Sequence, residues 1–222
     1  MSIIADDNDF LNTKPQGKKN PVVKTDANDN DRAFENSIRP KDFDSYIGQS
    51  NLLKHLKITI EASKKREKVL DHILFYGPPG LGKTTLAGVI GNEMGVPVKI
   101  TSAPALERPR DIIGILMSLE ENQILFIDEI HRLNKVAEEI LYPAMEDFFL
   151  DMTTGKAQTV KTLRIPLPKF TLIGATTKAG ELSGPLRDRF GIVHRLEFYS
   201  PEELAQVITR TAKLLDIEIY VV

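Results

Sequence analysis

The sequence predicts an α/β fold of three layers, in which helices cover both faces of a parallel β-sheet. Two observations predict it. Short apolar runs alternate along the chain with amphipathic helical patterns, and these runs are apolar at nearly every residue, which is typical of strands buried on both faces. The glycine-rich segment GPPGLGKTT, residues 77–85, also lies directly between one such run and a helical pattern.

The predicted elements follow one another in chain order. Residues 1–33, rich in Asp, Asn and Lys, are predicted to be a disordered polar tail. The first helix is predicted over residues 51–66, where leucine and isoleucine recur at near-helical spacing. Five strands are predicted at 72–76, 96–101, 123–128, 170–175 and 193–199. The helices between them are predicted at 84–94, 110–120 and 134–149.

Two further elements complete the expected fold. Residues 151–168 place β-branched runs on each side of a TGKAQ turn, which predicts a hairpin. A last helix is predicted over residues 200–215, because its first residues form a capping box. The Ser200 hydroxyl can accept a hydrogen bond from the amide of Glu203, while the Glu203 side chain reaches back to the start of the helix.

Composition limits the class of protein. The 222 residues carry a net charge of -2, which gives no overall attraction to nucleic acid. The absence of cysteine excludes disulfides and thiolate metal sites and fits a reducing compartment. No apolar run approaches the roughly 20 residues of a membrane span, and the N-terminus lacks the pattern of a signal peptide. We therefore expect a cytoplasmic protein with no membrane contact.

The glycine-rich loop carries the strongest chemical signal. Gly77, Gly82, Lys83 and Thr84 fit the pattern G-x-x-x-x-G-K-[ST]. Because the loop follows a strand and opens a helix, its amides and the helix N-terminus can face a phosphate. Lys83 would supply a cation for the β- and γ-phosphates of ATP, and the Thr84 hydroxyl would ligate Mg²⁺. The alternative, a glycine-rich turn with a solvated lysine, does not explain this context.

Two acids end the predicted strand at 123–128. Asp128 and Glu129 lie at the edge where open α/β sheets bind ligands. Asp128 would hold the metal through its water shell, and Glu129 would polarise the attacking water. The alternative is an acidic strand end that caps a helix. We expect His131 to be a loop or packing residue, since no other candidate metal ligand has suitable spacing.

Polar residues follow the next strand as well. Thr176 and Thr177 end the run LIGATT, where a hydroxyl could orient water or could be purely structural. Farther on, the segment PLRDRFG places Arg187 and Arg189 near the end of a short helix. They could form a solvated face. If one reaches the γ-phosphate in a neighbouring subunit, it acts as an arginine finger worth roughly 10³–10⁵ in rate.

Together these segments resemble the AAA+ ATPases and, more narrowly, the RuvB family of bacterial Holliday-junction branch-migration motors. The resemblance runs from about Ile38 to Ile217, and its most specific marks are EIHRL…EEILYPAMEDF, GATTKAG and PLRDRFGI. It implies a P-loop NTPase sheet with strand order 5-1-4-3-2, a large ATPase domain over 34–200 and the start of a small lid domain over 201–222.

The resemblance also implies roles for residues at matching positions. Residues on the base side of the nucleotide would be Ile38, Arg39, Tyr46, Ile47 and Tyr199. Gly80 and Thr85 would join Gly82, Lys83 and Thr84 at the phosphates. Thr177 matches sensor 1, and Arg189 matches a finger that acts on a neighbouring subunit, with Arg187 as runner-up. A segment that approaches ATP across the subunit boundary is matched by Glu146, Asp147 and Phe148.

Several partners follow from the same resemblance. A finger acting in trans implies a ring, which in this family is a hexamer that encircles DNA. The resemblance further implies that the ring uses ATP to drive branch migration of four-way junctions in recombination and repair. A RuvA-like junction-binding protein would dock on the hairpin at 151–168. Thr153 and Thr154 stand where the family is usually more aliphatic, so we expect weakened or altered docking.

The family pattern continues beyond what these residues contain. Members of the family carry the rest of the lid, with a second cation for the γ-phosphate, and then a winged-helix domain that contacts DNA. We therefore expect residues 1–222 alone to bind nucleotide weakly and not to move DNA. One alternative is a clamp-loader-like or replication-maintenance ATPase, although those usually carry zinc-binding cysteines or a different finger motif. The other is a truncated, non-catalytic nucleotide-binding or ring-interaction module.

Overall fold

The computed structural model describes residues 37–154 and 161–219. The chain divides into two compact units, Met1–Ser37 and Ile38–Val222, and every element below lies in the second. The predicted disordered tail and the predicted TGKAQ turn lie outside the described residues. The predicted limits at 33/34 and 200/201 stay predictions.

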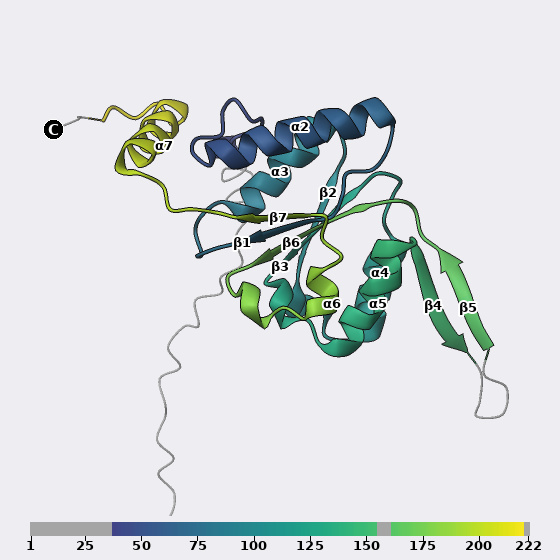
Figure 1. The fold of residues 1–222 in the computed structure, drawn as a ribbon. Coiled ribbons are helices and arrows are strands. Elements are labelled where there is room, and N and C mark those ends of the chain that lie inside the picture. The colour runs from purple at the N-terminus through teal and green to yellow at the C-terminus, as the bar shows by residue number, and fades with distance from the viewer. Residues whose placement is uncertain (1–36, 155–160, 220–222) are drawn as a thin grey trace, which may run out of the picture. The chain divides into compact units, whose positions relative to one another are not determined.

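A five-stranded parallel sheet forms the centre of the second unit, with the order β2-β3-β6-β1-β7 (Figure 1). Its strands are β1 (Ile73–Tyr76), β2 (Val98–Ser102), β3 (Ile124–Asp128), β6 (Thr171–Thr176) and β7 (Ile192–Arg195). When only these five strands are numbered in chain order, the sheet reads 5-1-4-3-2 from the β7 edge, which confirms the expected topology. The register pairs Tyr76 with Thr176 and Ser102 with Asp128, so the carboxyl ends of these strands meet at one edge.

Helices cover both faces of this sheet, as predicted. One face carries α2 (Ser50–Arg66) and α3 (Lys83–Met94), and the other carries α4 (Pro109–Met117), α5 (Lys135–Glu146) and the short α6 (Gly184–Arg187) (Figure 1). The 3₁₀ turns are η1 (Ala103–Leu106), η2 (Ile130–Arg132) and η3 (Ala179–Glu181). Two apolar clusters lie between the sheet and its helices. They include Leu56, Leu86 and Ile90 on one face and Ile112, Leu141 and Leu186 on the other, all fully buried.

The edge strands differ from the expectation of burial on both faces. β1, β3 and β6 are buried almost throughout, whereas β2 and β7 are only partly buried. Ile100 in β2 is 59% exposed and Val193 in β7 is 38% exposed. Both strands have a neighbour on one side only, so an apolar sequence did not guarantee burial. β7 also ends at Arg195, before the predicted end at residue 199.

The predicted hairpin is present as β4 (Phe149–Thr154) and β5 (Lys161–Pro166), an antiparallel pair that projects from the body of the domain (Figure 1). The pleat sorts its side chains by polarity. Asp151 and Arg164 pair across one face at 3.0 Å. The other face carries the apolar residues Leu150, Met152, Leu163 and Ile165. The side chains of Thr153 and Thr154 lie outside the described set.

The last helix, α7 (Pro201–Leu214), begins at the predicted capping box. The Ser200 hydroxyl accepts from the Glu203 amide at 3.2 Å, and the Glu203 carboxylate accepts from the Ser200 amide at 2.8 Å. Of the side chains in α7 only Ala212 is buried. Across the described ranges, none of the helices is both long and apolar enough to span a membrane.

Candidate functional site

The glycine-rich loop lies at the carboxyl edge of the sheet, between β1 and α3. The Gly77 amide donates to the Thr176 carbonyl at 3.1 Å, which fixes the loop against the end of β6. Gly77 has φ of 146°, and a Cβ at this position would lie 2.8 Å from the Leu196 carbonyl oxygen. Only glycine fits there without a shift of the backbone. The loop then enters α3 through Gly82, which is left-handed with φ of 82°.

Lys83 is the first residue of α3 and is nearly buried, with 8% of its surface exposed. Its Nζ donates to the carbonyl oxygens of Gly77 at 2.9 Å and Pro78 at 2.7 Å. Burial lowers the pKa of Lys83, and the nearby Asp128 carboxylate acts in the opposite direction. The ammonium is thus held by two carbonyl oxygens of the loop. A positive charge at this position can also attract the oxygen atoms of a bound phosphate.

A cavity of about 330 Å³ opens beside this loop. We call it the phosphate cavity. From outside the loop and the start of α3 it is lined by Asp128, Glu129 and Thr177, and also by Arg39, which was expected on the base side. From the loop and α3 it is lined by Pro79, Gly80, Leu81, Gly82, Lys83, Thr84 and Thr85. The structure thus brings together residues predicted from four separate segments of the chain.

A second cavity, of about 240 Å³, shares Gly80, Gly82 and Thr85 with the first. We call it the base cavity. Its other lining residues are Pro40, Tyr46, Ile47, Tyr199, Leu204, Val207 and Arg210. The hydroxyl oxygens of Tyr46 and Tyr199 are 3.4 Å apart. Burial raises the pKa of Tyr46, and the neighbouring Tyr199 adds to that shift.

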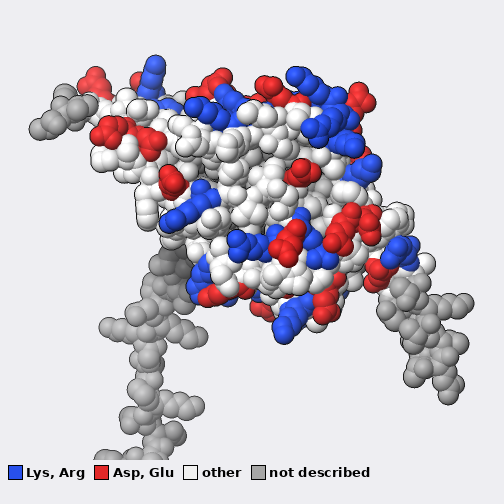
Figure 2. All heavy atoms as spheres, viewed as in Figure 1, with Lys and Arg blue, Asp and Glu red and all other residues white. Residues whose placement is uncertain are grey.

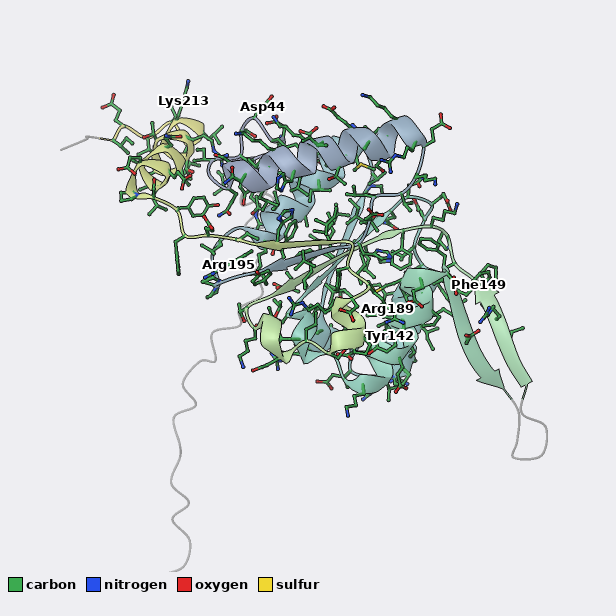
Figure 3. The ribbon with its side chains drawn as sticks, in the orientation of Figure 1. Asp44, Tyr142, Phe149, Arg189, Arg195 and Lys213 are labelled. Atoms are coloured by element: carbon green, nitrogen blue, oxygen red, sulfur yellow. The ribbon has the colours of Figure 1, made fainter. Side chains whose placement is uncertain are left out.

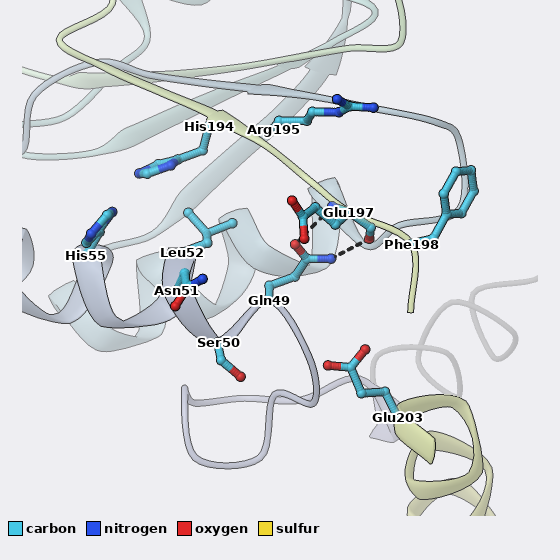
Figure 4. A pocket seen from close by; sticks show the side chains of 10 residues that line it. All are labelled: Gln49, Ser50, Asn51, Leu52, His55, His194, Arg195, Glu197, Phe198 and Glu203. Atoms are coloured by element: carbon cyan, nitrogen blue, oxygen red, sulfur yellow. Dashed lines mark hydrogen bonds between the residues drawn. The ribbon is translucent and has the colours of Figure 1, made fainter. Parts of the chain in front are cut away.

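The loop and both tyrosines are closely packed together. A Cβ at Gly82 would lie 2.8 Å from the Tyr46 hydroxyl, and one at Gly48 would lie 2.7 Å from the Tyr199 ring. The segment that leads to Tyr199 is held by Gln49. The Gln49 amide nitrogen donates to the Glu197 carbonyl at 2.7 Å, and its amide oxygen accepts from the Glu197 amide at 3.1 Å (Figure 4).

The two predicted acids sit at the end of β3. Asp128 is its last residue, and one of its carboxylate oxygens accepts from the Glu129 amide at 2.8 Å. Glu129 has a left-handed backbone with φ of 49°, and its carboxylate pairs with Arg132 at 2.9 Å. The hydrogen bond from Arg132 lowers the pKa of Glu129. Glu129 is therefore an ionised group at neutral pH, as a residue that polarises water must be.

The structure distinguishes between the two neighbouring threonines. Thr176 is fully buried, accepts from the Lys178 amide at 2.9 Å and lies 2.9 Å from His131 Nδ1. Thr177 lines the phosphate cavity. His131 accordingly joins η2 to the end of β6, which is the packing role expected for it. In the two described ranges no group of three or more His, Cys, Asp or Glu residues is arranged to hold a metal ion.

Arg189 lies outside both cavities. Its guanidinium packs over the Tyr142 ring at 4.4 Å (Figure 3). It also pairs with Glu146 at 3.0 Å and donates to the Pro185 carbonyl at 2.6 Å. It borders a separate cavity of about 530 Å³ that Glu146 and Phe148 also line. Arg187 ends α6 and is exposed.

Two other predicted residues are also absent from the nucleotide cavities. Asp147 follows α5 directly and is exposed, next to Glu146 and Phe148. Ile38 lines neither cavity through its side chain, but its carbonyl accepts from Arg210 at 2.7 Å. The segment 146–148 and Arg189 therefore share a region of the surface that does not contribute to this subunit's own phosphate cavity.

Sequence reasoning missed four residues of the base cavity, namely Pro40, Leu204, Val207 and Arg210. Three of them lie on α7 at spacings of three, which places them along one side of the helix. The capping box located this helix, but no local signal indicated that this side would line the base cavity.

Comparison with known proteins agrees with this geometry. The family model for the P-loop domain of the Holliday junction DNA helicase RuvB matches residues 38–196. The Holliday junction branch migration complex subunit RuvB of Crocosphaera subtropica is 58% identical over 212 residues, which are 96% of this chain and 60% of that protein. The same subunit of Fusobacterium nucleatum is 60% identical over 190 residues, covering 86% of this chain and 57% of that protein.

A solved structure of the RuvB Holliday junction branch migration motor of Thermotoga maritima superposes with a TM-score of 0.74 at 50% identity. The match covers 83% of this chain and 57% of that one. The chain thus spans about 60% of the length of the curated relatives that it matches. With the parallel sheet, the P-loop and the strand-end acids in place, the chain belongs to the RuvB family, and residues 38–196 are its P-loop domain.

Proposed function

We propose that these residues are the ATP-binding and ATP-hydrolysing part of a motor subunit that drives branch migration of Holliday-junction DNA in recombination and repair. One observation carries the proposal. A single cavity gathers Lys83, Asp128, Glu129 and Thr177 around the glycine-rich loop. The curated relatives at 58% and 60% identity are named as subunits of a Holliday junction branch migration complex.

The cavity has the groups that a Mg²⁺-nucleotide requires. Thr84 and Asp128 offer a hydroxyl and a carboxylate at the same cavity, and such hard oxygen ligands suit Mg²⁺. When bound, the metal would neutralise charge on the β- and γ-phosphates. The loop amides and the Lys83 ammonium would hold the phosphates, with the ammonium exchanging loop carbonyls for phosphate oxygens.

The remaining groups of the phosphate cavity have separate tasks. The ionised Glu129 would polarise the attacking water, once its pairing with Arg132 leaves an oxygen available. The Thr177 hydroxyl would orient that water or the γ-phosphate. On the other side of the loop, Tyr46, Ile47 and Tyr199 would contact the base, and Arg39 would lie near the phosphates.

Arg189 would act on the nucleotide of a neighbouring copy. It does not line this subunit's phosphate cavity, yet the Tyr142 ring, Glu146 and the Pro185 carbonyl hold its guanidinium in place. A positioned cation that has no substrate within its own subunit suits a finger supplied in trans. The adjacent segment 146–148 would then meet the same boundary. Repetition of this contact would close a ring, for which the family resemblance implies six copies.

The DNA and protein partners would use other surfaces. Figure 2 shows Lys and Arg interspersed with Asp and Glu on the face in view, which offers no single basic area for DNA. We assign contact with four-way junctions and duplex DNA mainly to the further domains of the family pattern. On the apolar face of the hairpin, Leu150 and Ile165 pack on the core of the domain, whereas Leu163 is exposed and Met152 is half-buried. These two residues offer a small apolar surface on which a RuvA-like protein would dock. A cytoplasmic location fits the cysteine-free sequence.

The proposal is tested by ATP turnover and strand exchange on a four-way junction, measured with the whole protein and with Lys83→Ala. We expect turnover in the wild type that depends on Mg²⁺ and is lost in the variant, together with loss of branch migration. Wild-type protein that binds and hydrolyses no nucleotide under these conditions would favour the non-catalytic ring-interaction module.

A further inference from the structure

Arg210 joins two distant parts of the chain at the base cavity. Its guanidinium nitrogens donate to the carbonyl oxygens of Ser45 and Ile38, each at 2.7 Å. These contacts span 165 and 172 residues of sequence. Both acceptors are backbone atoms in the segment 38–47. Arg210 therefore fixes the backbone path of that segment.

The segment that Arg210 holds forms part of the wall of the base cavity. Tyr46 and Ile47 follow Ser45 directly and line this cavity together with Arg210 itself. Arg210 Nε is also buried and has no hydrogen-bond acceptor among the described residues. The two terminal nitrogens of the guanidinium, and not Nε, therefore make the contacts that hold the segment.

The contact needs an arginine. A guanidinium is planar and carries five donors in a fork, so one side chain can reach two carbonyl oxygens at once, whereas a lysine ammonium acts as a single point. α7 has little else to hold it in place, since only Ala212 among its side chains is buried. Lys213, one turn farther along the same helix, is exposed.

We propose that Arg210 is a positioning residue that clamps the segment 38–47 to α7 and thereby forms the base-binding part of the site. The inference rests on the proposed ATP binding, and it assigns base and ribose binding to one part of the site and phosphate binding to another. Nucleotides recognised through their base and ribose depend on Arg210. A bare triphosphate, which needs only the glycine-rich loop, does not.

The test compares Mg²⁺-ATP with Mg²⁺-tripolyphosphate by calorimetry in the whole protein, with Arg210→Met, Arg210→Lys and the matched control Lys213→Met. We expect Arg210→Met to lower the affinity for ATP at least tenfold and the affinity for tripolyphosphate less than twofold. Arg210→Lys should give an intermediate loss of ATP affinity, and Lys213→Met should match the wild type. In turnover, the KM of Arg210→Met should rise while kcat at saturation stays within twofold.

Hydrogen exchange without ligand provides a second readout. Amides of residues 41–47 should exchange faster in Arg210→Met than in Lys213→Met, because the clamp is lost. Unchanged exchange together with wild-type ATP affinity would overturn the clamp. An equal loss of ATP and tripolyphosphate affinity would also overturn it, since Arg210 would then support the whole domain.

Two other results have a definite meaning. If Arg210→Met does not fold, Arg210→Lys decides by the same comparison. Wild-type protein that binds neither ligand would contradict the proposed function, and with it the separate roles of the base cavity and the glycine-rich loop. If the wild type binds ATP and Arg210→Met binds it equally well, the clamp is contradicted and the proposed function is not.

Discussion

On the phosphate side of the candidate site, Asp128 ends a buried strand, and Lys83 follows another strand after one short loop. On the base side, Arg210 lines the cavity from a helix outside the sheet. The first side inherits its geometry from the register of parallel strands. The second depends on a few polar contacts between segments more than 140 residues apart.

This difference teaches which half of the site is rigid. β1, β3 and β6 are almost fully buried, and an added Cβ at Gly77 would strike the backbone, so the phosphate side has little freedom to move. α7 buries a single side chain and is held by the Ser200 cap and the Arg210 contacts. We therefore expect variants of the phosphate side to change catalysis and variants of the base side to change affinity.

The largest effect should come from Arg189→Ala, because we propose that Arg189 acts on the nucleotide of a neighbouring copy. Loss of an arginine finger should lower kcat by roughly 10³–10⁵ and leave ATP affinity nearly unchanged. Arg187→Ala is the matched control, because Arg187 is exposed at the end of the same short helix. Steady-state turnover and ATP binding measure both variants. If Arg187→Ala abolishes turnover and Arg189→Ala does not, the two roles are exchanged.

The next largest effect should come from Glu129→Gln. An amide cannot polarise the attacking water as a carboxylate does, so kcat should fall by roughly 10²–10⁴ while nucleotide still binds. The control is Glu181→Gln, which removes an exposed carboxylate paired with Lys178 at 2.7 Å. Undiminished hydrolysis by Glu129→Gln would remove this residue from the mechanism.

Ser200→Ala sharpens the comparison from the base side. The loss of an N-cap costs about 0.5–2 kcal/mol of helix stability, so α7 should fray and ATP affinity should fall by up to about 30-fold, with tripolyphosphate affinity unchanged. Asn134→Ala removes the N-cap of α5, where Asn134 accepts from the Ala137 amide at 2.9 Å. This control should lower the melting temperature without the selective loss of ATP. If calorimetry finds that Ser200→Ala loses ATP affinity and tripolyphosphate affinity equally, the contrast between the base side and the phosphate side is wrong.

Tyr46→Phe should have the smallest effect. The variant keeps the ring in the base cavity and removes only a long hydroxyl contact of 3.4 Å with Tyr199. A weak hydrogen bond contributes about 0.5–1.5 kcal/mol, so ATP affinity should fall no more than about tenfold, and kcat should not change. A hundredfold loss of ATP affinity would mean that the hydroxyl contacts the nucleotide directly.

The phosphate side could be predicted from sequence because its signals are local. The glycine spacing fixes Lys83 and Thr84, and apolar runs that end in Asp128 and Thr177 place these residues at one sheet edge. The choice between Thr176 and Thr177 needed either the family resemblance or the structure, because both follow the same strand. The edge strands also needed the structure, since an apolar run such as VPVKIT does not reveal that one side has no neighbour.

The base side was only half predictable. Tyr46 and Tyr199 were assigned through the family resemblance, and both line the base cavity. Leu204, Val207 and Arg210 were not predicted, because their role depends on where α7 lies relative to the segment 38–47. A half-buried arginine that bonds two distant carbonyls leaves no pattern in its own neighbourhood. Tertiary packing decides such positions, and local sequence does not.

The measurement that tests the central claim most directly is ATP turnover in mixtures of Lys83→Ala and Arg189→Ala subunits. Each variant alone should be inactive, the first because it cannot hold the phosphates and the second because it supplies no finger. In a mixed ring, an Arg189→Ala subunit keeps an intact phosphate cavity that a Lys83→Ala neighbour can complete. We predict turnover that rises on mixing and peaks near equal amounts. No recovery at any ratio would contradict a site shared between copies of this chain.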